Sequence, residues 1–196
     1  RYKFTIEPDT LRFAQDAIAR RLLGRLSFKR ILQELILLLN EKDPVPALRR
    51  MNEIGAWEFV LPEVKLEEDA WITLRRIPRV LGWMAEEQLG TRLRPWVVYM
   101  AVLLSQLDNG RLSEVLNRYP LDRMAVNALR HIPDVKEIAK HLEREPMSMS
   151  QLDRKLRGLP WECLAYLLLI IHQESAWERA ARYLKMRDDV RVKLNG

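Results

Sequence analysis

Five basic side chains stand close together near the start of this 196-residue chain, and together they could hold an anion. Arg20, Arg21, Arg25, Lys29 and Arg30 fall within one short segment, and no Asp or Glu occurs from residue 17 to residue 33. Guanidinium and ammonium groups concentrated in this way can bind phosphate through charge-assisted hydrogen bonds. The pattern indicates a phosphate-binding surface, although the solvated sides of two ordinary helices would show the same residues.

The elements expected around these residues form a corner between two helices. Gly24 is expected to end the first helix and Ser27 to cap the second, so that Lys29 and Arg30 lie in the first turn of the second helix. Positive side chains there oppose the helix dipole at a cost of about 0.3–1 kcal/mol, unless an anion sits among the free amides. The alternative is that Arg30 pairs with Glu34 one turn later.

Two further basic areas lie later in the chain. The second is diluted by Asp153, Glu178, Asp188 and Asp189, and it comprises Arg154, Lys155, Arg157, Arg179, Arg182, Lys185, Arg187, Arg191 and Lys193. The third is a smaller stripe of Arg75, Arg76 and Arg79, which could equally be a solvated helix face. The net charge is +6 and the isoelectric point is about 9.6. Three separated basic areas suit a long, structured polyanion better than a small ligand.

The sequence contains no residue pattern that is typical of catalysis or metal binding. The chain has no Asp-x-Asp pair for two-metal chemistry, and its adjacent Asp188 and Asp189 more simply solvate the chain end. The three histidines do not fall at metal-ligand spacing, so they are interpreted as surface or core-edge residues. Cys163 is the only cysteine and lies in an apolar helix, where we expect a buried packing thiol of raised pKa.

The six tryptophans could stack on nucleic-acid bases, because aromatic rings do so in single-strand binding sites. Most of them stand among Leu, Val and Ile at helical spacing, which favours packing in a core or an interface. Trp177, beside Glu178 and Arg179, fits that interpretation least well.

Apolar residues recur at spacings of three and four, and no sustained alternation predicts a strand. The chain is therefore expected to be all-α, an irregular, elongated array of ten or eleven short helices. Pro78 falls inside one of them, where a kink or break is expected. The predicted helices cover residues 8–23, 27–40, 45–54, 68–85, 94–107, 111–118, 121–131, 134–143, 149–157, 161–171 and 174–186.

Acidic residues and Pro62 suggest a division into residues 1–62 and residues 63–196. We expect the two parts to pack continuously. The longest uncharged apolar run, Cys163–Ile171, is under half of the ~20 residues that a membrane-spanning helix needs, so no membrane partner is expected. A single cysteine fits a reducing cytoplasm. The first residue is Arg1, and we expect the chain to be a piece of a longer protein.

Several motifs resemble the class II tRNA nucleotidyltransferase and poly(A) polymerase family. They are Phe-Thr-Ile-Glu-Pro-Asp-Thr at residues 4–10, the segment of residues 21–35, Asp-Pro-Val-Pro-Ala-Leu at 43–48, Met-Asn-Glu-Ile-Gly at 51–55 and Leu-Pro at 61–62. The family pattern Ser-x-Glu-Arg-Ile-x-x-Glu-Leu is reproduced by Ser27, Arg30, Ile31, Glu34 and Leu35, with Lys29 in place of the family's Glu. Later segments, including residues 80–83, 96–104 and 183–196, look like the long bacterial members.

This resemblance implies that the matched region lies just beyond the family's catalytic head. The head, with its metal-binding carboxylates, Mg²⁺ and ATP or CTP, would then lie upstream, together with the Glu-Asp-x-x-Arg element that selects the base. The present residues would need no cofactor of their own. They would form the neck end, body and tail, which in this family hold the acceptor and TΨC arms of tRNA by shape and backbone.

Two functions therefore remain open. The first is a non-catalytic, tRNA-binding portion of an enzyme that adds A or CCA to tRNA 3′ ends, with the basic residues on RNA phosphates. The second is a helical protein–protein adaptor, in which tryptophans and apolar helix faces dock another subunit and the basic residues are solvated. The residues that would separate A addition from CCA addition are not among these.

Overall fold

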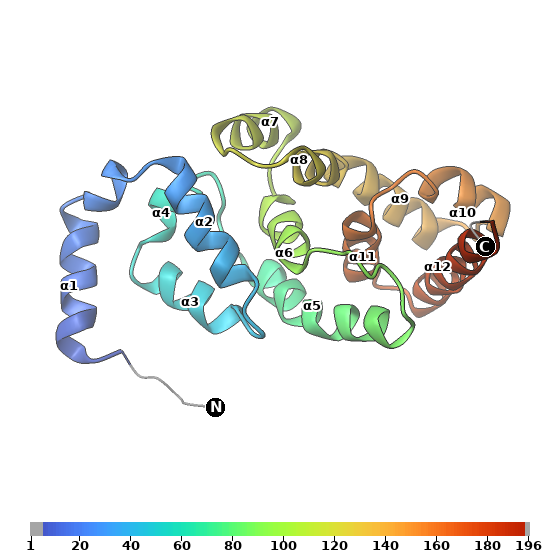
Figure 1. Cartoon of the computed structure of the whole chain (residues 1–196), viewed down its shortest axis with the longest axis horizontal. Coiled ribbons are helices and arrows are strands. Elements are labelled where there is room, and N and C mark those ends of the chain that lie inside the picture. Colours follow the sequence, from blue (N-terminus) through green and yellow to red (C-terminus); the bar gives the residue numbers. More distant parts are fainter. Residues whose placement is uncertain (1–5, 195–196) are drawn as a thin grey trace.

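The structure is a computed structural model, and it describes the backbone of residues 6–194 and the side chains of residues 6–187. Within that range the regular structure is entirely helical, as predicted, and the helices form an elongated array (Figure 1). The N-terminal layer comprises α1 (Pro8–Ala19), a 3₁₀ helix η1 (Leu22–Arg25), α2 (Phe28–Leu39), α3 (Val45–Glu53) and α4 (Trp57–Val60). Residues 4 and 5 of the first family-like motif lie outside the described residues.

The body and far end of the molecule contain the remaining helices. These are α5 (Glu68–Glu86), α6 (Pro95–Leu104), α7 (Asn109–Arg118), α8 (Arg123–Arg130), α9 (Ile132–Arg144), α10 (Met149–Leu156), α11 (Trp161–Ile170) and α12 (Glu174–Leu194). None of the helices in the described part of the chain is long and apolar enough to cross a membrane.

Two helices form the centre of the body because they are apolar on every side. Every residue of α6 from Trp96 to Leu104 is buried, and so is every residue of α11 from Glu162 to Leu169. A helix without a polar face must be enclosed by other helices. Helix α11 packs against α9, α5 and α6, which supply that enclosure (Figure 1).

The N-terminal layer joins the body through α2, which packs on α6, and α3, which packs on α5. Leu35 and Leu39 of α2 are buried, as is Leu48 of α3, and all three belong to the same hydrophobic core as α6 and α11. The core is thus continuous across the two parts. The division at residue 62 remains a prediction.

Two local expectations were wrong, and of the kink or break expected at Pro78 the break does not occur. The first helix ends at Ala19 instead of continuing to residue 23, because Arg21 adopts a left-handed conformation with φ 55°. Gly24 therefore lies inside η1 and does not end that helix. Helix α5 continues through Pro78 without a break, since its buried face, which includes Leu74, Ile77 and Val80, holds it against the body while Pro78 lies on the exposed side.

The interpretation of the tryptophans as packing residues is confirmed for most of them. Trp57, Trp71 and Trp96 are buried in the core, while Trp83, Trp161 and Trp177 are partly buried against it. Trp57 lies in the short helix α4, which was not predicted because its four residues are too few to show helical periodicity.

Candidate nucleic-acid interface

The basic corner, which we define as Arg20, Arg21, Arg25, Lys29 and Arg30, is built by a chain reversal between α1 and α2 (Figure 1). The left-handed turn at Arg21 leads into η1, and Ser27 then caps α2 by accepting a hydrogen bond from the Arg30 amide at 3.3 Å. The predicted role of Ser27 is confirmed. All five side chains are exposed, so the turn presents them together to solvent.

Two members of the corner have partners within the protein. The Arg20 guanidinium forms an ion pair with Asp16 one turn earlier, with Nε 2.9 Å from the carboxylate. The Arg21 guanidinium stands over the ring of Phe59 at 6.0 Å from its centroid. Both side chains are exposed, and these contacts orient the two groups without burying their charges.

The other three, Arg25, Lys29 and Arg30, have no acidic partner within 4.0 Å among the described residues. The alternative pair between Arg30 and Glu34 is absent there. The first turn of α2 carries no acidic residue, and the amides of Phe28 and Lys29 find no acceptor in the described part of the chain. Unpaired cations thus surround the positive end of a helix dipole, which is the arrangement that attracts phosphate.

A hollow of ≈ 230 Å³ lies beneath this corner, between η1, α2, α3 and α4. Its walls are almost entirely apolar and include Leu23, Leu26, Ile31 and Phe59, with Arg30 and Glu34 at its edge. Large apolar side chains are also exposed nearby, as Leu22, Leu26 and Phe28 show. The sequence carries little signal for this hollow, because its walls come from four elements separated along the chain.

The second basic area divides in the structure. Arg154, Lys155, Arg157 and Arg182 are exposed, whereas Lys185 forms an ion pair with Glu87 and stands over Trp83 at 5.7 Å. The side chain of Arg191 lies outside the described residues. This area therefore offers four exposed basic groups, two on α10, one directly after it and one on α12, that a phosphate could reach.

Within the second basic area, Arg187 is the residue least suited to bind a phosphate, because protein surrounds its side chain. It is only 9% exposed, and its guanidinium donates to the backbone oxygens of Leu156 and Leu159 at 3.2 and 3.3 Å. It also stands over the ring of Trp161 at 5.0 Å. These contacts tie α12 to the end of α10, so we leave Arg187 out of the proposed interface.

The third basic stripe also divides. Arg75 forms an ion pair with Glu68 at 2.9 Å, within α5. Arg76 and Arg79 instead line a groove that α5 shares with the start of α12. The structure thus places Arg76 and Arg79 beside residues of the start of α12, although about a hundred positions separate them in the chain.

Contacts that the sequence did not predict connect the start of α2, beside the basic corner, to the end of α7 in the body. We call this set of contacts the joint. Arg118, at the end of α7, forms an ion pair with Glu63 and stands over the ring of Phe28, the first residue of α2. The neighbouring Tyr119 contacts Phe28 edge to face at 5.5 Å and donates a hydrogen bond to the Val60 oxygen. No short-range pattern could have revealed a contact between residues 55 or more positions apart.

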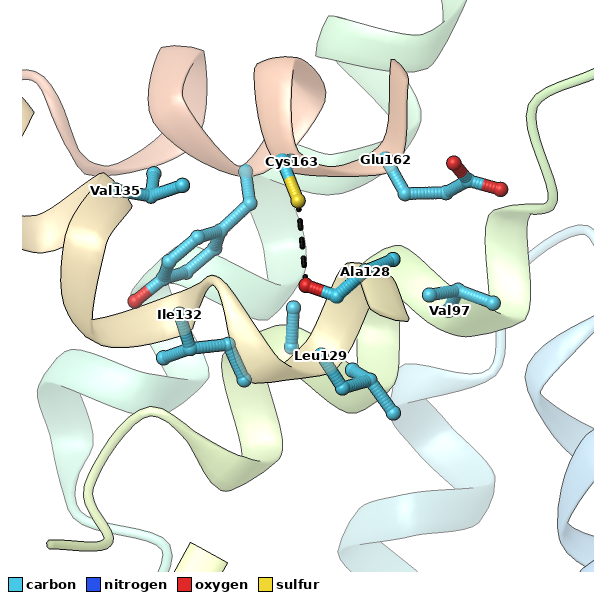
Figure 2. A pocket seen from close by; sticks show the side chains of 9 residues that line it. Val97, Ala128, Leu129, Ile132, Val135, Glu162 and Cys163 are labelled. Atoms are coloured by element: carbon cyan, nitrogen blue, oxygen red, sulfur yellow. Dashed lines mark hydrogen bonds between the residues drawn. The ribbon is translucent and has the colours of Figure 1, made fainter. Parts of the chain in front are cut away.

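The thiol of Cys163 has the environment expected of a packing residue (Figure 2). It donates a hydrogen bond to the Ala128 oxygen at 3.2 Å and faces Val97, Leu129 and other apolar side chains. Burial raises its pKa to about 12, which keeps it protonated and unreactive at neutral pH. Among the described residues no group of three His, Cys, Asp or Glu side chains could hold a metal ion.

Comparison with known proteins agrees with the family resemblance and with the helical fold. Residues 3–67 match the family model described as "Probable RNA and SrmB- binding site of polymerase A". The whole chain is 29% identical to an A-adding tRNA nucleotidyltransferase of Geobacter sulfurreducens. The resemblance to the tRNA nucleotidyltransferase and poly(A) polymerase family is thereby confirmed. The family model covers α1 to α4, so the basic corner lies inside it.

The remaining comparisons extend the likeness to this family over the rest of the chain. An A-adding tRNA nucleotidyltransferase of Halalkalibacterium halodurans is 25% identical over 195 residues. The chain spans 23% of the Geobacter protein and 42% of the Halalkalibacterium protein. The fold resembles the solved structure "Thermotoga maritima CCA-adding enzyme complexed with tRNA_CCA", with a TM-score of 0.77 and 23% sequence identity. This match covers 96% of the present chain and 45% of the Thermotoga chain.

Proposed function

We propose that this chain is the tRNA-binding helical portion of a nucleotidyltransferase that adds A or CCA to tRNA 3′ ends. Its curated relatives are A-adding tRNA nucleotidyltransferases, and one solved structure of the same fold is a complex with tRNA. The proposed role of these residues is to bind RNA, and the chemical step belongs to a catalytic head outside them. Mg²⁺ and ATP or CTP would act in that head.

The observation that carries the proposal is the set of unpaired cations around the start of α2. Arg25, Lys29 and Arg30 have no acidic partner among the described residues, and the helix start adds its own partial positive charge. In the proposed complex this corner holds one stretch of phosphate backbone. The exposed basic groups of α10 and α12 hold another, in the acceptor or TΨC arm.

We infer that the catalytic head contacts the N-terminal layer beside this corner. Leu22 and Leu26 of this segment are exposed at 39% and 38% of their surface, and Phe13 of α1 at 67%. Leu26 also lines the apolar hollow between η1, α2, α3 and α4. Contiguous exposed apolar surface typically marks an interface. The adaptor alternative would use the same surface for another protein and would leave the basic corner solvated.

The experiment that tests RNA binding compares variants of the corner with a matched control at low salt. The double variant Arg25→Ala/Lys29→Ala removes two unpaired charges, while Arg50→Ala removes an exposed charge that is already paired with Glu53 at 2.9 Å. We expect the double variant to bind tRNA at least about tenfold more weakly and Arg50→Ala to bind like the parent. If the parent itself binds no tRNA at low salt, the adaptor function is favoured instead.

A further inference from the structure

The groove between α5 and α12 is a second candidate binding site, in the body of the molecule and away from the N-terminal layer (Figure 1). Its volume is ≈ 410 Å³, within the range of pockets that hold small organic groups. Arg76, Arg79 and Trp83 line it from α5, and Trp177 and Glu178 line it from α12. It lies outside residues 3–67, which match the RNA-binding family model.

The two tryptophans of this groove differ from the core tryptophans in being partly exposed. Trp83 and Trp177 contact each other edge to face, with ring centroids 5.1 Å apart and an angle of 63° between the rings. This contact holds the two rings in fixed orientations beside the cavity. Rigid, accessible aromatic rings are the groups on which unpaired bases stack in RNA-binding proteins.

The groove is lined by arginines on its α5 side and by carboxylates at the start of α12, while Lys185, further along α12, is paired with Glu87 and stands over the Trp83 ring. Arg76 and Arg79 stand on the α5 side and have no ion-pair partner among the described residues, whereas Glu174 and Glu178 stand on the α12 side. The arginines can bind a phosphate, and the carboxylates can accept hydrogen bonds from the amino groups of a base. A nucleotide carries a phosphate at one end and a base at the other, so it could contact the arginines and the carboxylates at the same time.

We propose that this groove binds one unpaired nucleotide of the RNA, with its base against Trp83 and Trp177 and its phosphate at Arg76 and Arg79. The proposal rests on the RNA-binding function proposed above and extends it from backbone contacts to a single base. A base within a duplex is stacked between its neighbours, so the occupant is a nucleotide turned out of a loop or bulge. Adenine, cytosine and guanine carry an exocyclic amino group for the carboxylates, and uracil does not.

The test uses two variants and one control from the same region. Trp177→Leu removes the stacking ring but keeps an apolar side chain, and Arg79→Ala removes an exposed charge that contributes nothing to the core. Arg75→Ala removes the same charge from the same helix, but Arg75 is paired with Glu68 and does not line the groove. Far-ultraviolet circular dichroism checks that each variant is folded.

Affinity for tRNA is measured first. We expect Trp177→Leu to weaken binding at least about fivefold without changing the salt dependence, since it removes a stacked base and no phosphate contact. Arg79→Ala should weaken binding and lower the salt dependence, and Arg75→Ala should bind like the parent. If both groove variants bind as tightly as the parent while Arg25→Ala/Lys29→Ala does not, the groove proposal is wrong and the proposed RNA-binding function stands.

A second measurement tests nucleotide binding in the groove without using tRNA. A short unstructured oligoribonucleotide is titrated against tryptophan fluorescence, with adenosine monophosphate in a parallel titration. Quenching by the oligonucleotide that disappears in Trp177→Leu supports the groove even if the parent binds no tRNA. Absence of quenching contradicts it, and equal quenching by the free nucleotide shows a small-molecule site instead of an RNA site.

Discussion

Lys29 illustrates at the residue scale how binding and stability can oppose each other. It is exposed in the first turn of α2, beside the free amides and the positive end of the helix dipole. No acidic side chain in the described residues compensates it. Such a residue costs stability in the free protein and is useful only when an anion is bound.

Replacing this charge should therefore change stability and affinity in opposite directions. We expect Lys29→Gln to raise the free energy of unfolding by about 0.3–1 kcal/mol and to lower tRNA affinity, with a loss of about one unit in the salt slope. Urea unfolding and fluorescence anisotropy measure the two effects. The control is Lys42→Gln, the same change in the loop before α3, and it should alter the stability little. If Lys29→Gln binds tRNA as tightly as the parent, Lys29 does not belong to the RNA interface.

Arg187 is the opposite case, a basic residue that the sequence suggested for binding and that the fold surrounds with protein. Replacing it by Ala should lower the free energy of unfolding by about 1–3 kcal/mol, because the backbone oxygens of Leu156 and Leu159 would lose a charged donor. Arg182→Ala, an exposed change on the same helix, should stay within about 0.5 kcal/mol of the parent. If the Arg187→Ala variant is as stable as the parent but binds tRNA more weakly, Arg187 belongs to the RNA interface.

At the scale of elements, most helices could be predicted because proline, glycine and capping residues mark their ends. Ser148, for example, forms a capping box with Gln151 at the start of α10. Predictions failed where tertiary packing overrode a local signal. The body holds α5 continuous through Pro78, and Arg21 adopts a left-handed turn that its sequence neighbours do not indicate.

The joint formed by Glu63, Arg118 and Phe28 connects α7 to the start of α2, and no local sequence pattern predicts this contact. Burial raises the pKa of the Glu63 carboxyl, but the hydrogen bond and charge of Arg118 outweigh this, and the net result is a pKa below its ordinary 4.5. A group with a lowered folded-state pKa contributes stability above its unfolded pKa and loses that contribution as pH falls. The joint should therefore weaken in acid, starting near pH 4.5.

The variant Glu63→Gln tests this joint. It should be less stable than the parent at neutral pH, and the difference should shrink as pH falls below 4.5 because the parent's carboxyl becomes protonated. Urea unfolding across this pH range measures the effect, with Glu53→Gln, which changes an exposed pair with Arg50, as the control. A stability difference that is the same at all pH values would contradict the role of the Glu63 charge.

At the scale of the whole molecule, the basic corner and the groove between α5 and α12 lie in different parts of the elongated array (Figure 1). The basic residues of the first site lie close together in the sequence, so it could be proposed from residues 20–35 alone. The second could not be predicted, because Arg79 and Trp177 meet only after α5 and α12 have packed on the same body. A continuous core through α2, α6 and α11 fixes the two sites relative to each other.

The central claim is that phosphate contacts of the basic corner bind structured RNA. The most direct test is the dependence of tRNA affinity on salt concentration for the parent and for Arg25→Ala/Lys29→Ala/Arg30→Ala. Each lost phosphate contact should lower the slope of log affinity against log salt by about 0.7–0.9, so we expect the triple variant to lose about two to three units. An equal slope in the parent and the triple variant would contradict the account.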